Sequence, residues 1–235
     1  KPSENLARGM ESTMVLFCWK DGALLEDSQC PQKIIQVDIA PLAAGPVRIP
    51  QWRSTLSPYD PEEADQGPCE GLRYVESQEA LPAQDVGRQI TLTDVKSSTY
   101  RRLIQEASGA AEVNIQQLAR IDLDGNGTEE VLFEVNSHEG FMLEGPTHLV
   151  SLVGMRAIVD GEVKTFIIHD TQKTLKAGEQ IHYWQRGSLL GVTDVEGDGR
   201  LEVVLGDHYY EGGYTGIFTF DGKQLKHLAG NGCGA

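Results

Sequence analysis

Hydrophobic and polar positions follow the same order twice in the C-terminal half of the chain. The segments "QLARIDLDGNGTEEVLFEV" (117–135) and "LLGVTDVEGDGRLEVVLGD" (189–207) each hold an apolar run, an acidic loop with two glycines, and a second apolar run. The runs are rich in β-branched residues and leucine, and the loops are rich in Asp, Asn and Gly, as in β-strands joined by turns. Each segment therefore predicts two strands joined by an acidic loop.

Both units continue in the same way after their acidic loops. Further strands are predicted around Asp160-Gly161 in the first unit and Asp221-Gly222 in the second, because Asp-Gly is a strong hairpin signal. Four strands per unit in a fixed order are typical of blade-like repeats such as those of β-propellers. The alternative is two unrelated hairpins that share turn chemistry. We predict a mainly β fold, with two blade-like four-stranded antiparallel repeats in residues 117–235.

The N-terminal part is less regular. Six of the ten prolines fall between residues 41 and 68, and proline lacks the N–H that a central strand needs, so this segment is predicted to be an extended loop. Before it, "MVLFCWKDGALLE" predicts a short hairpin that turns at Asp21-Gly22. Residues 1–96 are therefore expected to be a loop-rich part with one β-hairpin.

Residues 97–116 have a helical pattern. Ser98 is a candidate N-cap, and Leu103, Ile104 and Ala107 follow at helical spacing until Gly109 interrupts the pattern. We predict one helix of about three turns, with room for a second short helix after it. This segment would connect the N-terminal part to the repeats.

Composition and charge narrow the class of protein. A chain of 235 residues with 40% hydrophobic residues can bury a sizeable core. The net charge of −15 repels nucleic acid and anionic membrane surfaces and attracts cations, so nucleic acid is not an expected partner. No apolar run reaches the roughly 18 residues of a membrane span. The first residues do not open a signal peptide, so an exported protein would have lost its signal.

The four cysteines point to an oxidising compartment. Cys18, Cys30, Cys69 and Cys233 form no CxxC pair, which argues against a zinc or redox motif and favours two disulfides. Three pairings are possible, of which we favour Cys18 with Cys30 and Cys69 with Cys233. Four buried free thiols in a cytoplasmic protein are the alternative. We therefore expect a secreted or periplasmic protein.

The acidic loops have the chemistry of a calcium site. Ca²⁺ takes six to eight oxygen ligands, which a short loop supplies by alternating side chains and turning at glycine. The first loop offers oxygens from Asp122, Asp124, Asn126, the Thr128 carbonyl and Glu130. The second offers them from Asp194, Glu196, Asp198, the Arg200 carbonyl and Glu202. Solvated turns with no metal are the alternative reading, because turns favour the same residue types.

These loops are not EF-hands. An EF-hand needs a bidentate Glu at position 12 and a following helix, but Phe133 and Leu205 occupy that position within apolar runs. The loops instead resemble the D-x-D-x-D-G-x-x-D calcium loops of FG-GAP and VCBS-type repeats, which the integrin α-chain propeller also uses. The resemblance covers about residues 117–228 and implies a structural Ca²⁺ between the first two strands of each blade. The Phe-Gly and Gly-Ala-Pro signatures are absent, and the longer Glu196 is expected to weaken the second site.

A histidine follows each acidic loop and its second strand. "SHEGF" holds His138 and Glu139, and "DHYYEGGYTG" holds His208, Tyr209, Tyr210, Glu211 and Tyr214. Equivalent connections of a repeat emerge at equivalent ends, so these loops are expected on one face, with the tyrosines as a contact patch for carbohydrate or peptide. Ordinary exposed loop residues are the alternative. The aromatic residues predicted to serve packing alone are Trp52, Tyr59, Tyr74 and Trp184.

No catalytic motif is present. The sequence has no G-x-S-x-G elbow, no P-loop, no G-x-G-x-x-G after a strand and no H-E-x-x-H. We therefore predict a secreted or periplasmic calcium-stabilised binding or scaffold module. The alternative is a hydrolase with an active site among the loops that contain His138 and His208.

Overall fold

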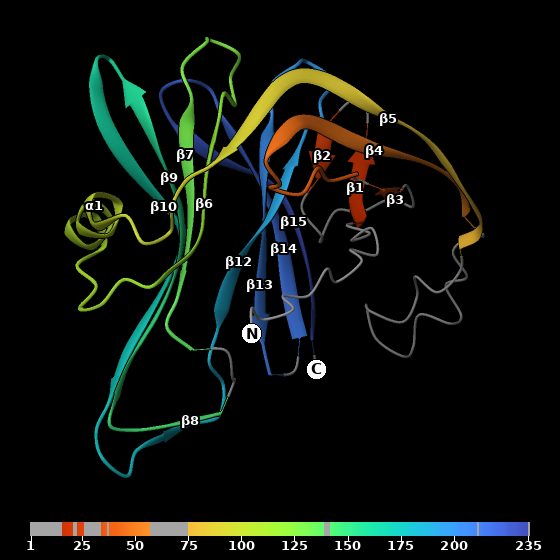
Figure 1. The fold of residues 1–235 in the computed structure, drawn as a ribbon. Coiled ribbons are helices and arrows are strands. Elements are labelled where there is room, and N and C mark those ends of the chain that lie inside the picture. The colour runs from red at the N-terminus through yellow and green to blue at the C-terminus, as the bar shows by residue number, and fades with distance from the viewer. Residues whose placement is uncertain are drawn as a thin grey trace, which may run out of the picture.

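A computed structural model describes most of the chain (Figure 1). The described backbone covers residues 16–20, 23–25, 34–36, 38–56, 75–138, 142–210 and 212–234, and the described side chains are those of residues 38–51, 81–138, 142–210 and 212–230. Its elements are β1 (Leu16–Lys20), β2 (Ala23–Leu25), β3 (Ile34–Gln36), β4 (Gly45–Leu56), β5 (Val75–Leu92), α1 (Ser98–Ser108), β6 (Ile115–Ile121), β7 (Glu130–Asn136), β8 (Leu143–Glu144), β9 (Thr147–Val159), β10 (Glu162–Leu175), β11 (Gln180–Ile181), β12 (Arg186–Thr193), β13 (Glu202–Tyr209), β14 (Gly212–Phe220) and β15 (Leu225–Gly234). The predicted mainly β class is confirmed.

Each sequence repeat forms a meander of four antiparallel strands. The first is β6, β7, β9 and β10, which belong to a six-stranded sheet of order β10-β9-β7-β6-β5-β4. The second is the four-stranded sheet β12-β13-β14-β15. In both, the acidic loop joins the first two strands, as predicted. The described sheets are open, and none closes on itself.

The prediction of an extended loop after residue 41 is wrong for its first part. The chain forms β4, a 12-residue strand that contains Pro46 and Pro50 and pairs with the 18-residue β5. β4 is an edge strand, and the register shifts between Pro46 and Arg48 and again between Ile49 and Gln51. Edge position and bulges are what allow proline in a strand, because no ladder partner is left without its donor. The rest of the predicted loop, residues 57–68, lies outside the described chain.

The hairpin predicted near the N-terminus is confirmed by its strands. β1 and β2 pair antiparallel with Lys20 opposite Ala23, and β3 pairs along the other side of β1. A further segment before β4 reaches the second sheet, where Ala40 forms a β-bridge with Val192 of β12.

The predicted helix is present, with its start one residue earlier than expected. Ser97, and not Ser98, is the N-cap, and its Oγ accepts the Tyr100 N–H at 3.5 Å. Gly109 ends the helix in the left-handed conformation at φ 70°. After it the chain runs directly into β6, so the second short helix is not formed in this described segment.

The core lies between the two sheets and continues under the helix. Ile121 and Val153 of the first sheet pack in one cluster with Val203 of the second and with Ile49 and Ile90 of the N-terminal part. The other face of the first sheet packs against α1 through a second cluster that includes Ile104, Phe133 and Leu152. Full burial of one such side chain contributes about 1.5–3 kcal/mol. Residues before 96 therefore share a core with both repeats, while the predicted domain boundaries stay a prediction.

Of the four aromatic residues predicted to serve packing, Trp184 has a described side chain. Trp184 is buried with Leu149 and Leu175, as expected of a packing residue. The side chains of Trp52, Tyr59, Tyr74 and the four cysteines are outside the described ones, so the disulfides stay a prediction. No helix within the described ranges has the length and hydropathy of a membrane-spanning helix.

Candidate functional site

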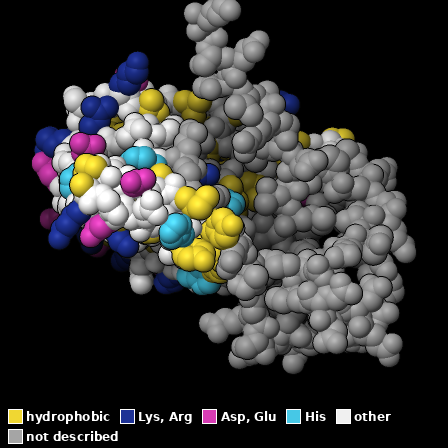
Figure 2. Space-filling view, turned by 90° about the horizontal axis from the view of Figure 1, so that it is seen from below, with side chains coloured by type: hydrophobic (Ala, Val, Ile, Leu, Met, Phe, Trp, Pro, Cys, Tyr) yellow, Lys and Arg dark blue, Asp and Glu magenta, His cyan; other side chains and the backbone are white. Residues whose placement is uncertain are grey.

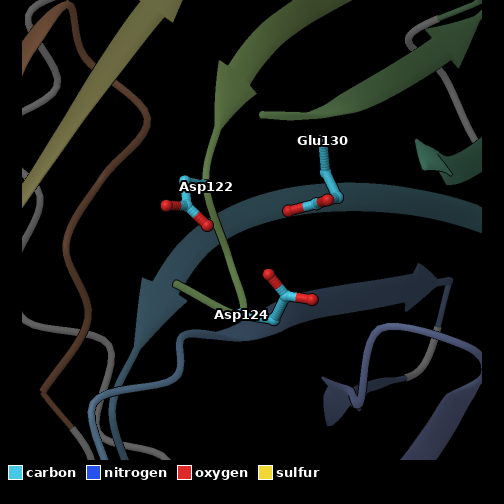
Figure 3. A group of neighbouring side chains, drawn as sticks. All are labelled: Asp122, Asp124 and Glu130. Carbon is cyan, nitrogen blue, oxygen red and sulfur yellow. The ribbon is translucent and has the colours of Figure 1, made fainter. Parts of the chain in front are cut away.

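Three carboxylates converge in the first acidic loop (Figure 3). Asp122 directly follows β6, Glu130 opens β7, and Asp124 lies in the loop between them. One oxygen from each carboxylate lies within 4.8 Å of the other two. Two of the three groups are thus held at the ends of paired strands. Glu130 is buried, and the two aspartates are half-buried.

The loop is preorganised by its own hydrogen bonds. The Asp122 carboxylate accepts the N–H groups of Gly125 at 2.7 Å and Gly127 at 3.0 Å, and both glycines have positive φ. Asn126 donates to Asp124 from its main chain and its amide, and its Oδ1 accepts the Thr128 N–H at 2.7 Å. The side chain of Asn126 is therefore engaged within the loop, while the three carboxylates face one another.

Glu130 is the most perturbed acid of the first loop. The pKa of Glu130 is raised to about 7, mainly by burial and also by the charges of Asp124 and Asp122, while the N–H of Leu123, which donates to its carboxylate at 2.8 Å, acts in the opposite direction. A cation bound among these oxygens would favour the ionised carboxylate, because opposite charge nearby lowers a carboxyl pKa.

The second loop repeats part of this arrangement. Glu202 is fully buried, its carboxylate accepts the Val195 N–H at 2.9 Å, and burial raises its pKa to about 7. Asp194 accepts the N–H groups of Asp198 and Gly199, both at 3.1 Å. Counted from the first aspartate of each loop, the contacts made by positions 6 and 9 recur in the second loop. The other N–H that the first aspartate accepts comes from position 5 here, but from position 4 in the first loop.

The second loop differs in where its other acids lie. Glu196 and Asp198 are exposed, and Asp198 lies 3.8 Å from the guanidinium of Arg200. Among the described residues, the first loop alone brings three acidic groups together. The first loop is thus the better-formed candidate for a metal site, in the order that the sequence predicted.

The two loops are in direct contact. The Leu201 N–H donates to the Leu123 carbonyl at 2.8 Å. Arg88 of β5 donates from Nε to the Asp122 carbonyl and from Nη2 to the Gly199 carbonyl, both at 3.1 Å. Its Nε also lies 3.8 Å from Asp122 Oδ2. Arg88 therefore ties the N-terminal part of the chain to both acidic loops.

Sequence reasoning missed Arg88 as part of this site. It lies 34 residues before Asp122 and 111 before Gly199, in a strand of mixed polarity without a motif. The structure shows how closely Arg88 approaches the loop: a Cβ on Gly125 would lie 2.3 Å from Arg88 Nη2 and would displace the guanidinium.

The predicted tyrosine cluster is only partly assembled. Tyr210 is 54% exposed and makes an edge-to-face contact with Tyr183, which is 62% exposed, with ring centroids 5.8 Å apart. Tyr209 is half-buried. Tyr214 stacks on His227, and its hydroxyl lies 2.6 Å from His227 Nε2. Tyr183 therefore takes the place beside Tyr210 that the sequence assigned to Tyr214.

The histidine-containing connections lie at the end of the sheets opposite the acidic loops. His138 is half-buried, with its ring nitrogens 2.9 Å from Ser137 Oγ and 3.3 Å from Thr147 Oγ1. His208 is exposed at the end of β13. Glu139 and Glu211 lie outside the described residues. Figure 2 shows hydrophobic and histidine side chains gathered on this end of the molecule.

A buried polar network joins the two sheets near this second end. Its members are Glu134 and Asn136 of β7, Ser151 of β9, His169 of β10, Gly187 of β12 and Asp207 of β13. Burial raises the pKa of Glu134, in spite of hydrogen bonds from Leu189 and Asn136 and the charge of Arg186, which lower it. These residues lie within apolar strands, and no sequence motif groups them.

Comparison with protein-family models, curated proteins and solved structures found no match to this chain.

Proposed function

We propose that this protein is a secreted or periplasmic binding or scaffold module stabilised by Ca²⁺. The convergence of Asp122, Asp124 and Glu130 is the observation that carries the proposal. All three ligands are hard oxygen donors on a glycine-containing loop, which is the donor set that Ca²⁺ prefers. Bound Ca²⁺ supplies positive charge where three carboxylates meet, and its role is structural.

The repeats are proposed to be blade-like modules related to those of FG-GAP and VCBS-type proteins. In support, each repeat is an antiparallel meander of four strands whose acidic loop lies between the first and second strands. The second loop is proposed as a weaker site, because Glu196 and Asp198 are exposed.

Ligand binding is proposed at the opposite end. Tyr183 and Tyr210 together offer exposed aromatic surface with polar hydroxyls, which suits stacking on carbohydrate or contact with a peptide. His138, His208 and Tyr209 flank this end of the sheets and are proposed as further contacts.

A calcium titration tests the proposal. Binding to the folded state alone stabilises it by about 2.7 kcal/mol at 100-fold excess over Kd. Thermal melting with chelator, with Ca²⁺ and with Mg²⁺ should show a higher Tm in Ca²⁺. Asp122→Asn should reduce the Ca²⁺ effect strongly and Asp194→Asn less, while Asp160→Asn, which changes an acidic residue of the β9–β10 turn that belongs to neither loop, serves as the control. Identical melting curves in chelator and Ca²⁺ would contradict the proposal.

A hydrolase is the second candidate function. The exposed His208 beside Asp207, at the end that carries the aromatic pair, is the observation that favours it. Chromogenic esters, phosphates and glycosides are suitable probes, with His208→Asn as the matched variant. Turnover that is lost in this variant, and that does not depend on Ca²⁺, would support a hydrolase with a structural metal.

A further inference from the structure

The two sheets are joined by a buried contact between His169 of β10 and Gly187 of β12. The Gly187 N–H is shared between two acceptors of the first sheet, Ser151 Oγ at 2.9 Å and His169 Nε2 at 3.1 Å. Ser151 is fully buried, and the His169 side chain is 9% exposed. The start of β12 is thus bound to the first sheet by hydrogen bonds that water does not reach freely.

The geometry fixes the protonation state of His169. Because Nε2 accepts a hydrogen bond from a peptide N–H, it carries no proton, and the proton of the neutral ring is on Nδ1. Nδ1 lies 3.8 Å from Asp207 Oδ2 of β13. No side chain separates the ring from the peptide, since a Cβ on Gly187 would lie 2.6 Å from the imidazole Cδ2.

The same glycine is held through its carbonyl as well. Asn136 Nδ2 donates to the Gly187 carbonyl at 3.2 Å and to Glu134 Oε1 at 2.8 Å, and Glu134 Oε2 accepts the Leu189 N–H at 2.8 Å. Asn136 Oδ1 and Asp207 Oδ1 are buried with no hydrogen-bond partner. The network therefore depends on a fixed distribution of donors and acceptors, and an added proton would disturb it.

We propose that the His169–Gly187 contact is a proton-sensitive latch between the two sheets, closed while His169 is neutral and opened when it is protonated. Protonation at Nε2 would set an N–H donor against the Gly187 N–H at a distance where an acceptor is needed. It would also place a positive charge in a buried position, which costs free energy unless the charge is paired.

The surrounding charges act on His169 in a definite direction. Burial lowers its pKa, and the charges of Asp207 and Asp170 act against this effect without cancelling it. Other ionisable groups belong to the same network: Arg186 of β12 favours the ionised form of Glu134 on β7 and opposes protonation of His208 on β13. These groups are the same in the unchanged protein and in His169→Gln, so a comparison of the two isolates the effect of His169.

The sign of the pH effect follows from linkage. With a folded-state pKa below the usual 6.5, the opened state takes up a proton first as the pH falls below 6.5. The opening equilibrium then increases by up to about tenfold per pH unit, until the pKa of the closed state is reached. Neutral pH keeps the latch closed.

Opening would affect one end of the molecule selectively. Arg186, next to the latch, lies opposite His208 in the β12–β13 ladder. Tyr183 and Tyr210 lie just beyond these two positions in the chain. The acidic loops lie at the other end, where Leu201 and Leu123 are joined by their own hydrogen bond. The latch would therefore loosen the aromatic end and leave the acidic-loop end intact, and it does not depend on a bound metal.

Amide hydrogen exchange on the full chain tests this inference. Rates for Gly187 and Leu189, corrected for intrinsic exchange, are measured by NMR at pH 7.5 and pH 5.0, with the Leu201 amide as an internal reference. We expect protection at Gly187 to fall at least several-fold more than at Leu201. His169→Gln should abolish this difference, because an amide oxygen accepts a hydrogen bond without titrating in this range. Equal losses at both amides, or an unchanged fall in His169→Gln, would overturn the inference.

A second measurement keeps the inference testable if His169→Gln does not fold. In the unchanged protein, an NMR titration of His169 should show a midpoint below 6.5 and an Nδ1–H tautomer at pH 7.5. Asp207→Asn should lower the midpoint further, because it removes a charge that favours the imidazolium. An Nε2–H tautomer, or a midpoint at or above 6.5, would overturn the inference.

Discussion

The main-chain N–H of Leu201 in the second acidic loop donates a hydrogen bond of 2.8 Å to the carbonyl of Leu123 in the first. The two acidic loops belong to separate repeats in the sequence, but they are in direct contact in the structure. Arg88 adds a hydrogen bond to each loop, to the carbonyls of Asp122 and Gly199. A change in the structure of one loop is therefore expected to alter the structure of the other.

Arg88→Gln should destabilise the fold by about 1–3 kcal/mol, because it removes charge-assisted hydrogen bonds to two carbonyls in a partly buried position. Denaturant midpoints in chelator measure the loss without any metal contribution. Arg102→Gln removes an exposed helix pair and should cost about 0.5 kcal/mol or less. Equal losses in the two variants would show that Arg88 is no more than a surface charge.

Gly125→Ala should cost more than Gly127→Ala, although both lie in the same loop with similar positive φ. A Cβ at position 125 would displace the Arg88 guanidinium, whereas a Cβ at 127 meets nothing within 4 Å. Backbone strain of about 1–2 kcal/mol is common to both. The excess should disappear when each change is made in an Arg88→Gln background. An excess that persists there would place its cause elsewhere.

Without divalent cations, stability should fall as the pH rises from about 4.5 to about 7 through the ionisation of Glu130 and Glu202. The pKa of each is raised to about 7 from 4.5 in the folded state, so the folded state holds more protons than the unfolded state across this window. His169 and His208, whose pKa values are lowered by burial, act in the opposite direction below 6.5.

The contribution of Glu130 is obtained by difference. Urea unfolding of the unchanged protein and of Glu130→Gln at pH 5 and pH 7.5 should show a smaller fall for the variant. Saturating Ca²⁺ should reduce the fall in the unchanged protein alone. If both proteins lose the same stability, with and without Ca²⁺, Glu130 is not titrating in this range.

Replacing Tyr183 and Tyr210 together by Ala should abolish ligand capture on a glycan or peptide array and leave the Ca²⁺-dependent melting shift unchanged. The pair is exposed and far from the acidic loops, so its loss removes contact area without opening the core. Ile158 and Val163 are an exposed cross-strand pair on the β9–β10 hairpin, and their joint change to Ala controls for general loss of apolar surface. Undiminished capture by the tyrosine variant would remove the basis for a binding surface there.

The mass of the unreduced protein should be lower by four hydrogens than that of the reduced chain if two disulfides are present. A bridge between Cys69 and Cys233 closes a long loop and would stabilise by about 4–5 kcal/mol in the chain-entropy model. Peptide mapping decides the pairing. β1, which holds Cys18, contacts β15, which holds Cys233, so a Cys18–Cys233 bridge is the outcome to distinguish from the favoured one. Four free thiols in protein from an oxidising compartment would refute the bridges.

The repeats could be predicted because their signals are local. Alternating apolar runs, Asp-Gly turns and paired acidic loops each lie within about ten residues, and strands joined by short turns usually pair with each other. The helix was predicted for the same reason, and its N-cap was misplaced by one residue because Ser97 and Ser98 are adjacent and chemically equivalent.

Other features depend on contacts that local sequence does not encode. β4 was missed because proline argues against a strand, and only its edge position and bulges make Pro46 and Pro50 acceptable there. Arg88, the Tyr183–Tyr210 pair and the His169–Gly187 contact join residues that are 18 or more positions apart. Their proximity follows from how the two sheets stack, which no single segment determines.

Helix α1 makes the two faces of the first sheet different, because one face packs against the second sheet and the other packs against the helix. Its buried residue Ile104 closes one face of the first sheet, while Arg101, Arg102 and Glu106 face solvent. Repeat arrays end in units with a polar outer surface, because a bare apolar face would recruit another copy. α1 therefore occupies this face of the first sheet, and another sheet could stack there only if the helix were displaced.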